Sequence, residues 1–277
     1  MVEHRTLIPI LRTAIGCLLV GLTLLGVGSS SALAESDLSD WRIEQDRSSY
    51  PVGADGEVRI VNLRGGVNLR AGDGDQVVIS TVSQRHLDDP REPGVHFEDL
   101  PNGVSVEVRF DDGANIDEKT EWRNRRIDIG VSVPEGVAVS IRTRDGDIEV
   151  QDLAGRADLE TTIGDITFKC SGGLQARSDS GSVFAQFRRS DWSEPVSIKT
   201  STGEIRAELL EGAKATATIE TRGSITTDFT VAINRNPGSR LKRGVATIGA
   251  GGQELHLTSY NGQIRLLAVI VPEEKSE

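Results

Sequence analysis

The sequence predicts an all-β protein built as a parallel β-solenoid, or flattened β-roll, with coils of about 20 residues. Three observations support this fold class. Apolar and polar residues alternate through most of the chain, glycine recurs at a nearly constant spacing, and the 277 residues include 30 Gly but only 6 Phe, 3 Trp and 2 Tyr. A core filled by small and β-branched side chains therefore has to be thin, and stacking repeats is what completes it.

The N-terminal segment 1–34 has the composition of an export signal. Arg5 and Arg12 precede an apolar run from Ala14 to Val27, and Ala32-Leu33-Ala34 places small residues at a cleavage position. We therefore expect removal of residues 1–34, a location in the periplasm or at the cell surface or outside the cell, and no stable membrane insertion after cleavage. The alternative is an uncleaved membrane anchor.

Three further segments follow the predicted signal peptide. Residues 35–54 form a polar leader, residues 55–271 form the β-strand-repeat solenoid domain, and residues 272–277 form a short acidic tail. No linker separates a second domain. An exposed coil end offers unpaired backbone groups, so we expect the leader and the irregular segment 80–126 to cap or flank the roll.

One pattern occurs six times in the second half of the chain. Alternating apolar residues lead to a polar turn with a central glycine, and the alternation then resumes. These glycines are Gly146, Gly164, Gly181, Gly203, Gly223 and Gly262. Each follows the one before by close to one period, except that Gly262 follows Gly223 by close to two. An earlier copy surrounds Gly65, close to four periods before Gly146, so we expect the intervening segment to continue the roll.

The turn residues predict how each coil bends. A glycine at a fixed place indicates a backbone position with φ > 0, where a Cβ would clash. A hydroxyl residue stands three positions before most of these glycines and two before Gly223. The set is Thr143, Thr161, Ser178, Thr200, Ser259 and Thr221. Since these hydroxyls share the inward parity, we expect a ladder at the corner in which each bonds its neighbour.

The polar residues between the apolar ones are predicted to face solvent. They include Arg142, Arg144, Glu149, Lys199 and Arg206. Such strands present a broad charged surface to a partner, although any one of these residues is more often simply solvated.

Several stretches resemble a known family. The run Val133-Pro134-Glu135-Gly136-Val137, the repeat at 139–150 and the closing repeat at 255–264 are similar to the bacterial putative-adhesin family, domains of unknown function with β-strand repeats. The resemblance covers roughly Val58 to Leu266. It implies a non-catalytic envelope or surface domain, and the family has no catalytic motif to carry over.

Composition and motifs exclude several functions. With 31 Lys plus Arg against 42 Asp plus Glu, the net charge of −11 argues against nucleic acid as a partner. The sequence lacks a nucleophile elbow, a phosphate-binding loop and a zinc-binding His-Glu-x-x-His motif. The glycine-rich stretch 249–252 lacks the third glycine and helix of a dinucleotide site, so we expect a turn there and no cofactor.

Histidine and cysteine are scarce after the signal. His86, His96 and His256 lie far apart in the sequence and do not predict a shared metal site. Cys170 would be the single cysteine of the processed chain, so an intrachain disulfide is impossible. We expect it to be a small buried apolar residue; a redox or dimer-forming thiol is the alternative.

The acids beside the turn glycines form the one candidate site. Parallel stacking should bring Asp147 and Asp165 close together, where they could bind Ca²⁺. The same column continues with Ser182, Glu204, Ser224 and Gln263, so it is not an unbroken acidic ladder. We therefore expect a structural role for both acids in the turn and no metal site; the alternatives are cation binding by Asp147 and Asp165, or a pair of catalytic carboxylates acting on polysaccharide.

The sequence therefore favours a non-catalytic exported envelope or surface protein with a structural or adhesive role. Its expected partner is an unidentified protein or glycan of the cell envelope or surface. Two alternatives stay open: a carbohydrate-active β-helical enzyme, and an envelope-stress or regulatory module that acts through protein contacts.

Overall fold

The computed structural model describes residues 40–53, 55–72, 74–89, 93–110, 125–235 and 237–270. Contacts place Leu38–Glu277 in one compact unit. The predicted signal peptide 1–34, the first residues of the leader, the acidic tail 272–277 and Trp122 lie outside the described residues. Among the residues described, no helix has the length and apolar character needed to cross a bilayer.

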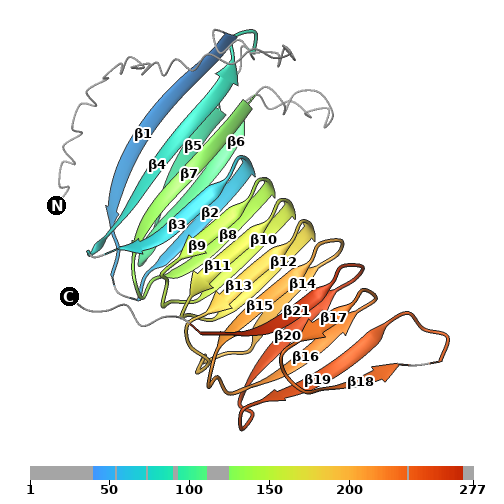
Figure 1. Cartoon of the computed structure of the whole chain (residues 1–277). Helices are drawn as coiled ribbons and strands as arrows, with labels where there is room; N and C mark the ends of the chain where they lie inside the picture. Colours follow the sequence, from blue (N-terminus) through green and yellow to red (C-terminus); the bar gives the residue numbers. More distant parts are fainter. Residues whose placement is uncertain are drawn as a thin grey trace, which may run out of the picture. The chain divides into compact units, whose positions relative to one another are not determined.

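Two large sheets face each other across one apolar core (Figure 1). The ten-stranded sheet, here sheet A, has the order β1 (Trp41–Pro51), β4 (Gln76–His86), β7 (Arg125–Pro134), β3 (Val67–Gly72), β9 (Ile148–Gln151), β11 (Ile166–Cys170), β13 (Val183–Phe187), β15 (Ile205–Leu210), β21 (Ile264–Val269) and β17 (Ile225–Thr227).

The eleven-stranded sheet, here sheet B, has the order β18 (Val231–Arg235), β19 (Lys242–Ile248), β16 (Ala215–Thr221), β20 (Gln253–Ser259), β14 (Val196–Thr200), β12 (Leu174–Ser180), β10 (Ala157–Ile163), β8 (Ala138–Asp145), β2 (Glu57–Arg64), β6 (Gly103–Phe110) and β5 (Pro93–Leu100). Each coil contributes one strand to each sheet.

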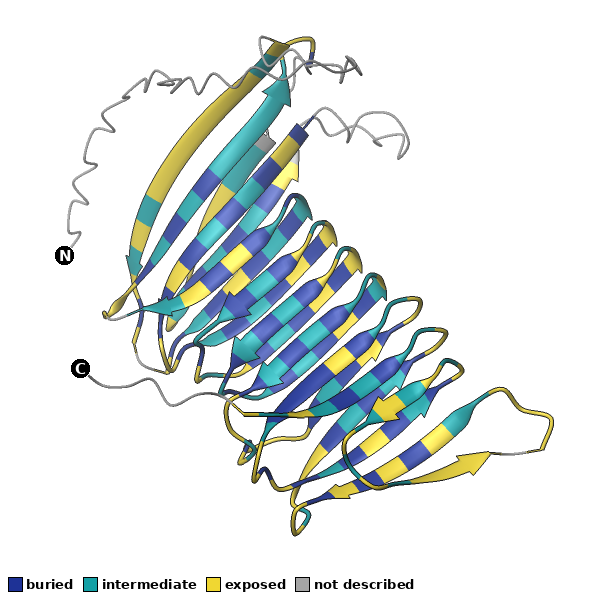
Figure 2. Cartoon of the chain, viewed as in Figure 1, coloured by how far each residue is buried: buried dark blue, intermediate teal, exposed yellow. Residues whose placement is uncertain are grey.

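The predicted parallel solenoid is confirmed by strand pairing and burial. Ile141, Leu159 and Ala176 lie opposite one another in β8, β10 and β12, and all three are buried. Figure 2 shows the resulting alternation of buried and less buried residues along each strand. Equal spacing of the apolar residues keeps successive coils in register, because a slip by one residue would turn every apolar side chain outward.

Aliphatic side chains fill most of the core, as the composition predicts. The large buried aromatic residues are confined to one place, where Phe168, Phe187 and Trp192 pack in series with ring centroids 5.7 and 4.9 Å apart. These three residues belong to neighbouring coils, so the aromatic cluster fixes the coils from β11 to β14 against each other.

The spatial order of the coils differs from their order in the sequence near the N-terminal end. Strand β2 pairs directly with β8, and β3 with β9, so the coil at Gly65 contacts the coil at Gly146. The intervening segment does not lie between these two coils. It continues both sheets on the other side of β2 and β3, where β6 and β7 pair parallel with them, so the prediction that it continues the roll is confirmed for β6 and β7, in a different spatial order.

A second reordering occurs near the C-terminal end. The last coil, β20 and β21, is inserted between the coil of β14 and β15 and the coil of β16 and β17. The long interval between Gly223 and Gly262 in the sequence therefore does not mark two stacked periods. The chain instead makes a hairpin of β18 and β19 before it returns to fill the gap.

The corner glycines are required for a different reason from the one predicted. A positive φ occurs at Gly65 and Gly164, but not at the other corner glycines. What they share is close contact with the next coil: a Cβ at Gly203 would lie 1.8 Å from the carbonyl oxygen of Gly181. The spatial order of this column is Gly65, Gly146, Gly164, Gly181, Gly203, Gly262 and Gly223.

The hydroxyl column is in the predicted place, but its hydrogen bonds go elsewhere. Thr161 Oγ1 donates to the Gly146 carbonyl at 3.0 Å, and Thr200 Oγ1 donates to the Gly181 carbonyl at 2.8 Å. Ser178, Ser259 and Thr221 bond the glycine of the adjacent coil in the same way. The hydroxyls thus bond the carbonyl oxygens of the corner glycines and not one another, because the tight corner brings that backbone within reach.

One member of the column supplies a matched test of these bonds. Thr200→Val should lower the free energy of unfolding by about 1–2 kcal/mol, because Thr200 also accepts from the Gly203 amide at 3.1 Å. Thr143→Val should be close to neutral, since Thr143 Oγ1 is buried and has no hydrogen-bond partner among the described residues. Chemical denaturation of both variants checks the difference; equal losses would contradict the assigned bonds.

Added strands cover the N-terminal end of the stack. Residues 41–51 of the predicted leader form β1, which pairs antiparallel with β4, while β5 pairs antiparallel with β6. Tyr50 stacks on Phe97 at 5.4 Å and is partly buried against the core. β1 itself is mostly exposed and rich in charged residues, which discourages pairing with another chain.

Candidate binding site

The predicted site residues Asp147 and Asp165 do lie in adjacent coils, just after the corner glycines. The backbone amide of Asp165 donates to Asp147 Oδ1 at 2.8 Å, and the amide of Ser182 donates to Asp165 Oδ1 at 2.7 Å. Asp128 holds the Gly66 amide in the same way at 2.8 Å. Each carboxylate therefore binds a backbone amide of the next coil.

This arrangement provides few ligands for a cation. Within the described part of the chain, no group of three or more His, Cys, Asp or Glu side chains lies close enough to hold a metal ion. Ca²⁺ takes six to eight oxygen ligands. The cation site at Asp147 and Asp165 stays a prediction, and the observed bonds assign both residues a role in the turn.

The three histidines lie on separate elements. His86 ends β4 and packs edge-on against Trp41 at 5.5 Å. His96 lies in β5, and His256 lies in β20 with its Nε2 3.1 Å from Glu254. They do not converge on one place.

The outward strand residues largely neutralise one another. Arg142 lies 3.4 Å from Glu160 of the next strand, and Glu149 accepts from Asn68 at 3.0 Å. Arg206 bonds Glu208, and its guanidinium lies 5.4 Å from the centre of the Phe184 ring. These sheet faces are therefore polar ladders, and a shallow depression of about 480 Å³ on sheet B is lined by residues of this kind, among them Arg59, Arg142 and Asp158.

A cavity lies where the repeat is interrupted. The turn between β13 and β14, residues 188–195, is longer than the turns at 152–156 and 171–173 that occupy the same place in earlier coils. Trp192 anchors it, because the side chain is only 3% exposed and packs edge-on against Phe187. The rest of the turn is thereby held over the neighbouring turns.

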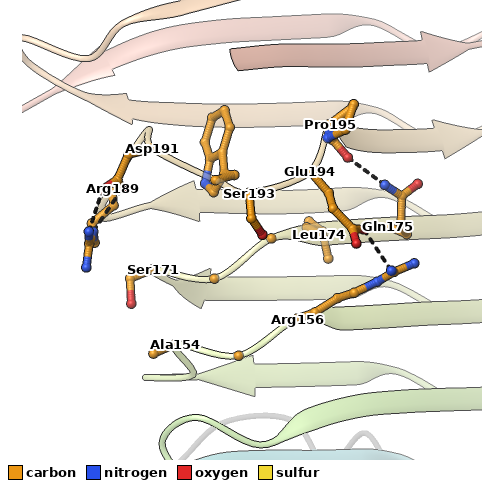
Figure 3. Close-up of a pocket in the computed structure, with 14 residues that line it drawn as sticks. Ala154, Arg156, Ser171, Leu174, Gln175, Arg189, Asp191, Ser193, Glu194 and Pro195 are labelled. Carbon is orange, nitrogen blue, oxygen red and sulfur yellow. Dashed lines mark hydrogen bonds and ion pairs between the residues drawn. The ribbon is translucent and has the colours of Figure 1, made fainter. Parts of the chain in front are cut away.

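The cavity has a volume of about 370 Å³ and is lined by three successive turns (Figure 3). Its floor contains Ala154, Gly155, Gly172 and Gly173. Side chains are excluded from part of this floor, since a Cβ at Gly172 would lie 1.8 Å from the Gly155 carbonyl oxygen. Glycine at this position therefore lets the neighbouring turns pack closely beneath the cavity.

Polar side chains form the rim of this cavity (Figure 3). Arg156 Nη1 lies 2.7 Å from Glu194 Oε2, and Gln175 Nε2 donates to the Pro195 carbonyl at 2.7 Å. Arg189 and Asp191 form a further ion pair. The rim therefore carries donors and acceptors that pair with one another, and a ligand with hydroxyl or amide groups can exchange hydrogen bonds with them.

Sequence reasoning missed this cavity. The signal was the interval between Gly181 and Gly203, which is the longest between consecutive coils of the regular series. The insertion sits on the edge opposite the corner glycines, so the glycine pattern carried no information about its shape.

Cys170 is buried and its thiol points to a backbone carbonyl, with Sγ 3.4 Å from the Val150 oxygen. Burial raises the pKa of the Cys170 thiol to about 12. The prediction that it is a buried small residue is confirmed.

Cys170 should therefore resist alkylation in the folded protein. Because the thiolate is the nucleophile, iodoacetamide should label it only in denaturant, and in a Cys17→Ser background the added Ser193→Cys should react readily. The raised pKa also makes stability depend on pH. The thiol of the unfolded chain loses its proton at lower pH than the thiol of the folded protein, so the free energy of unfolding falls as pH rises from about 9 to about 12. Native labelling near pH 8 would contradict this.

Comparison with known proteins gives one family match and several solved structures with low sequence identity. A family profile described as Toastrack DUF4097 matches residues 124–267. No curated protein matches the sequence. A putative cell adhesion protein from Clostridium sporogenes has a similar structure, with a TM-score of 0.47 and 10% identity, covering 82% of this chain and 100% of that chain. A putative adhesin from Bacteroides fragilis has a TM-score of 0.39 and 11% identity, covering 82% and 97%.

Proposed function

Because this chain belongs to the Toastrack family of domains of unknown function (DUF4097), we propose that it is a non-catalytic, exported binding protein of the cell envelope or cell surface. The membership confirms the family resemblance noted in the sequence. In this proposal the stacked coils are a rigid support, and the cavity over residues 188–195 is where a polar ligand binds.

The observation that carries the proposal is the cavity itself. A solenoid stabilised by repeated contacts tolerates an insertion in one turn, and rigid scaffolds commonly place binding residues on such turns. This turn is anchored by buried Trp192 and carries the Arg156–Glu194 pair at its rim. A ligand that replaced this pair with its own hydrogen bonds would be held on a preformed surface.

Capture from envelope extracts and glycan arrays tests the proposal. The variant Arg156→Ala with Glu194→Ala should lose binding by at least about tenfold, because charge-assisted hydrogen bonds contribute about 1.5 kcal/mol or more each. The control variant Arg177→Ala with Asp179→Ala removes a similar exposed pair in β12 and should bind normally. Equal binding by both variants would show that the cavity is not the site.

The alternatives make different predictions. Polysaccharide turnover that disappears in Asp147→Asn would identify an enzyme and overturn the proposal. Specific capture of a regulatory protein would favour the envelope-stress module over an adhesin. Cell fractionation combined with protease accessibility distinguishes the periplasm from the surface.

A further inference from the structure

The hairpin of β18 and β19 extends the stack on one side. Sheet B continues beyond β16 with these two strands, whereas sheet A ends at the three-residue strand β17 in the described part of the chain (Figure 1). The inward face of the hairpin therefore has no further strand of sheet A opposite it. Phe229 and Val231 are partly buried against the core, but Ile233 is 44% exposed.

Positive charge is concentrated at this end of an acidic protein. Residues 222–248 contain five cations and one acid, a net charge of +4 in a chain whose total is −11. The cations are Arg222, Arg235, Arg240, Lys242 and Arg243.

The hairpin cations differ in how far they are neutralised. Arg243 lies 3.2 Å from Glu220 yet remains 65% exposed, and Lys242 Nζ donates to the Gly223 carbonyl. Arg235 and Arg240 are exposed and have no ion pair among the described residues. The tip of the hairpin consequently presents positive charge that the protein does not itself compensate.

Apolar side chains accompany the cations. Ile233 on β18 and Val245 on β19 are 44% and 48% exposed, on opposite faces of the hairpin. Surfaces that combine exposed aliphatic residues with several Lys or Arg bind at the boundary between lipid headgroups and acyl chains. A soluble acidic partner would form ion pairs with the cations, but it would leave these isolated aliphatic side chains without an apolar contact.

A second copy of the chain fits this edge less well. β18 is only five residues long, so pairing with a second copy would add few backbone hydrogen bonds. Its free edge also carries Arg235, and positive residues commonly protect free edges from such pairing.

We propose that the hairpin of β18 and β19 docks the protein peripherally on an anionic lipid surface. The cations at the hairpin tip contact the phosphate groups, and Ile233, on the same face of the hairpin as Arg235 and Lys242, enters the interfacial region. The rest of the acidic molecule is directed away from the bilayer, so the cavity over residues 188–195 stays open to solvent.

Vesicle co-sedimentation tests the proposed lipid binding. The protein is purified from cells that express and export the full chain. It should bind vesicles of phosphatidylcholine with about 30 mol% phosphatidylglycerol far better than pure phosphatidylcholine, and binding should weaken as NaCl rises from about 0.05 to about 0.5 M. Arg235→Glu with Arg240→Glu should weaken binding by at least about 30-fold, since each cation near an anionic surface contributes about fivefold.

The matched control is Arg59→Glu with Arg142→Glu, which changes the net charge equally on the outer face of sheet B. It should bind as the unmodified protein does, and thermal melting should show both double variants folded. Equal loss in both variants, or equal binding to neutral vesicles, would overturn the proposal. Sedimentation velocity that shows dimers abolished by Arg235→Glu with Arg240→Glu would also overturn it, because the hairpin would then join two copies.

Discussion

Gly203→Ala should be among the most destabilising single substitutions in this protein. The added Cβ would lie 1.8 Å from the Gly181 oxygen, 2.3 Å from its carbonyl carbon and 2.7 Å from the Ser182 nitrogen. All three contacts are with the backbone of the neighbouring corner between β12 and β13, so no side chain can move aside. We expect a loss of about 3 kcal/mol or more in the free energy of unfolding and a melting temperature lower by roughly 10 °C.

Gly173→Ala is the matched control for this substitution. Gly173 also lies in a turn between coils, but a Cβ there would have no heavy atom within 4 Å, and its φ is not in the left-handed region. Alanine should leave stability unchanged or raise it by about 0.5 kcal/mol, because it restricts the unfolded chain. If Gly203→Ala and Gly173→Ala had the same melting temperature, the contact between coils would not require glycine at the corner.

The contrast between these glycines shows what the sequence could predict. Period, parity and corner position follow from alternation that is visible in each coil, and all three are confirmed for the coils around Gly146, Gly164 and Gly181. The reason for the glycines was not visible, because the clash is with a carbonyl oxygen of another coil. The sequence indicates which residues tolerate a positive φ, but it does not give the distance between the corners of neighbouring coils.

The spatial order of the coils was also beyond the sequence. Parallel strands with the same apolar alternation can pair with any neighbour at similar energy, so the chain order does not decide the stacking order. One local feature agrees with the observed placement: Thr221 lies two residues before Gly223, whereas Ser259 lies three before Gly262. The tighter turn occupies the end of the column, where it has to match only one corner.

The candidate sites also differ in how far the sequence predicts them. The repeat places Asp147 and Asp165 in one column, and for the same reason each carboxylate binds a backbone amide of the next coil. The cavity and the basic hairpin arise where the repeat is broken, after Phe187 and after Thr227. Irregular segments carry little periodic signal, so their shape depends on contacts such as the burial of Trp192.

Removing one partner of the buried ion pair at the N-terminal end should be the other large effect. Arg125 and Asp89 are 3% and 4% exposed, and the guanidinium binds both carboxylate oxygens, with Nη2 2.8 Å from Oδ1. Arg85 also donates to the Asp89 carbonyl oxygen. The pair fixes the segment after β4 to the start of β7, which supports the coil next to β3.

Asp89→Asn should lower the free energy of unfolding by about 3–5 kcal/mol, because it removes the negative charge that faces a buried guanidinium. Asp179→Asn removes the acid of an Arg–Asp pair that is 59% and 45% exposed, and should cost about 1 kcal/mol or less. Adding Arg125→Met to Asp89→Asn should recover much of the loss, since no unpaired buried charge then remains. Denaturant titration at low salt and at about 1 M NaCl measures the free energy of unfolding of each variant. The loss caused by Asp89→Asn should be the same at both salt concentrations, because salt screens buried ion pairs poorly. A loss no larger than that of Asp179→Asn would mean that solvent reaches the Arg125–Asp89 pair in the folded protein.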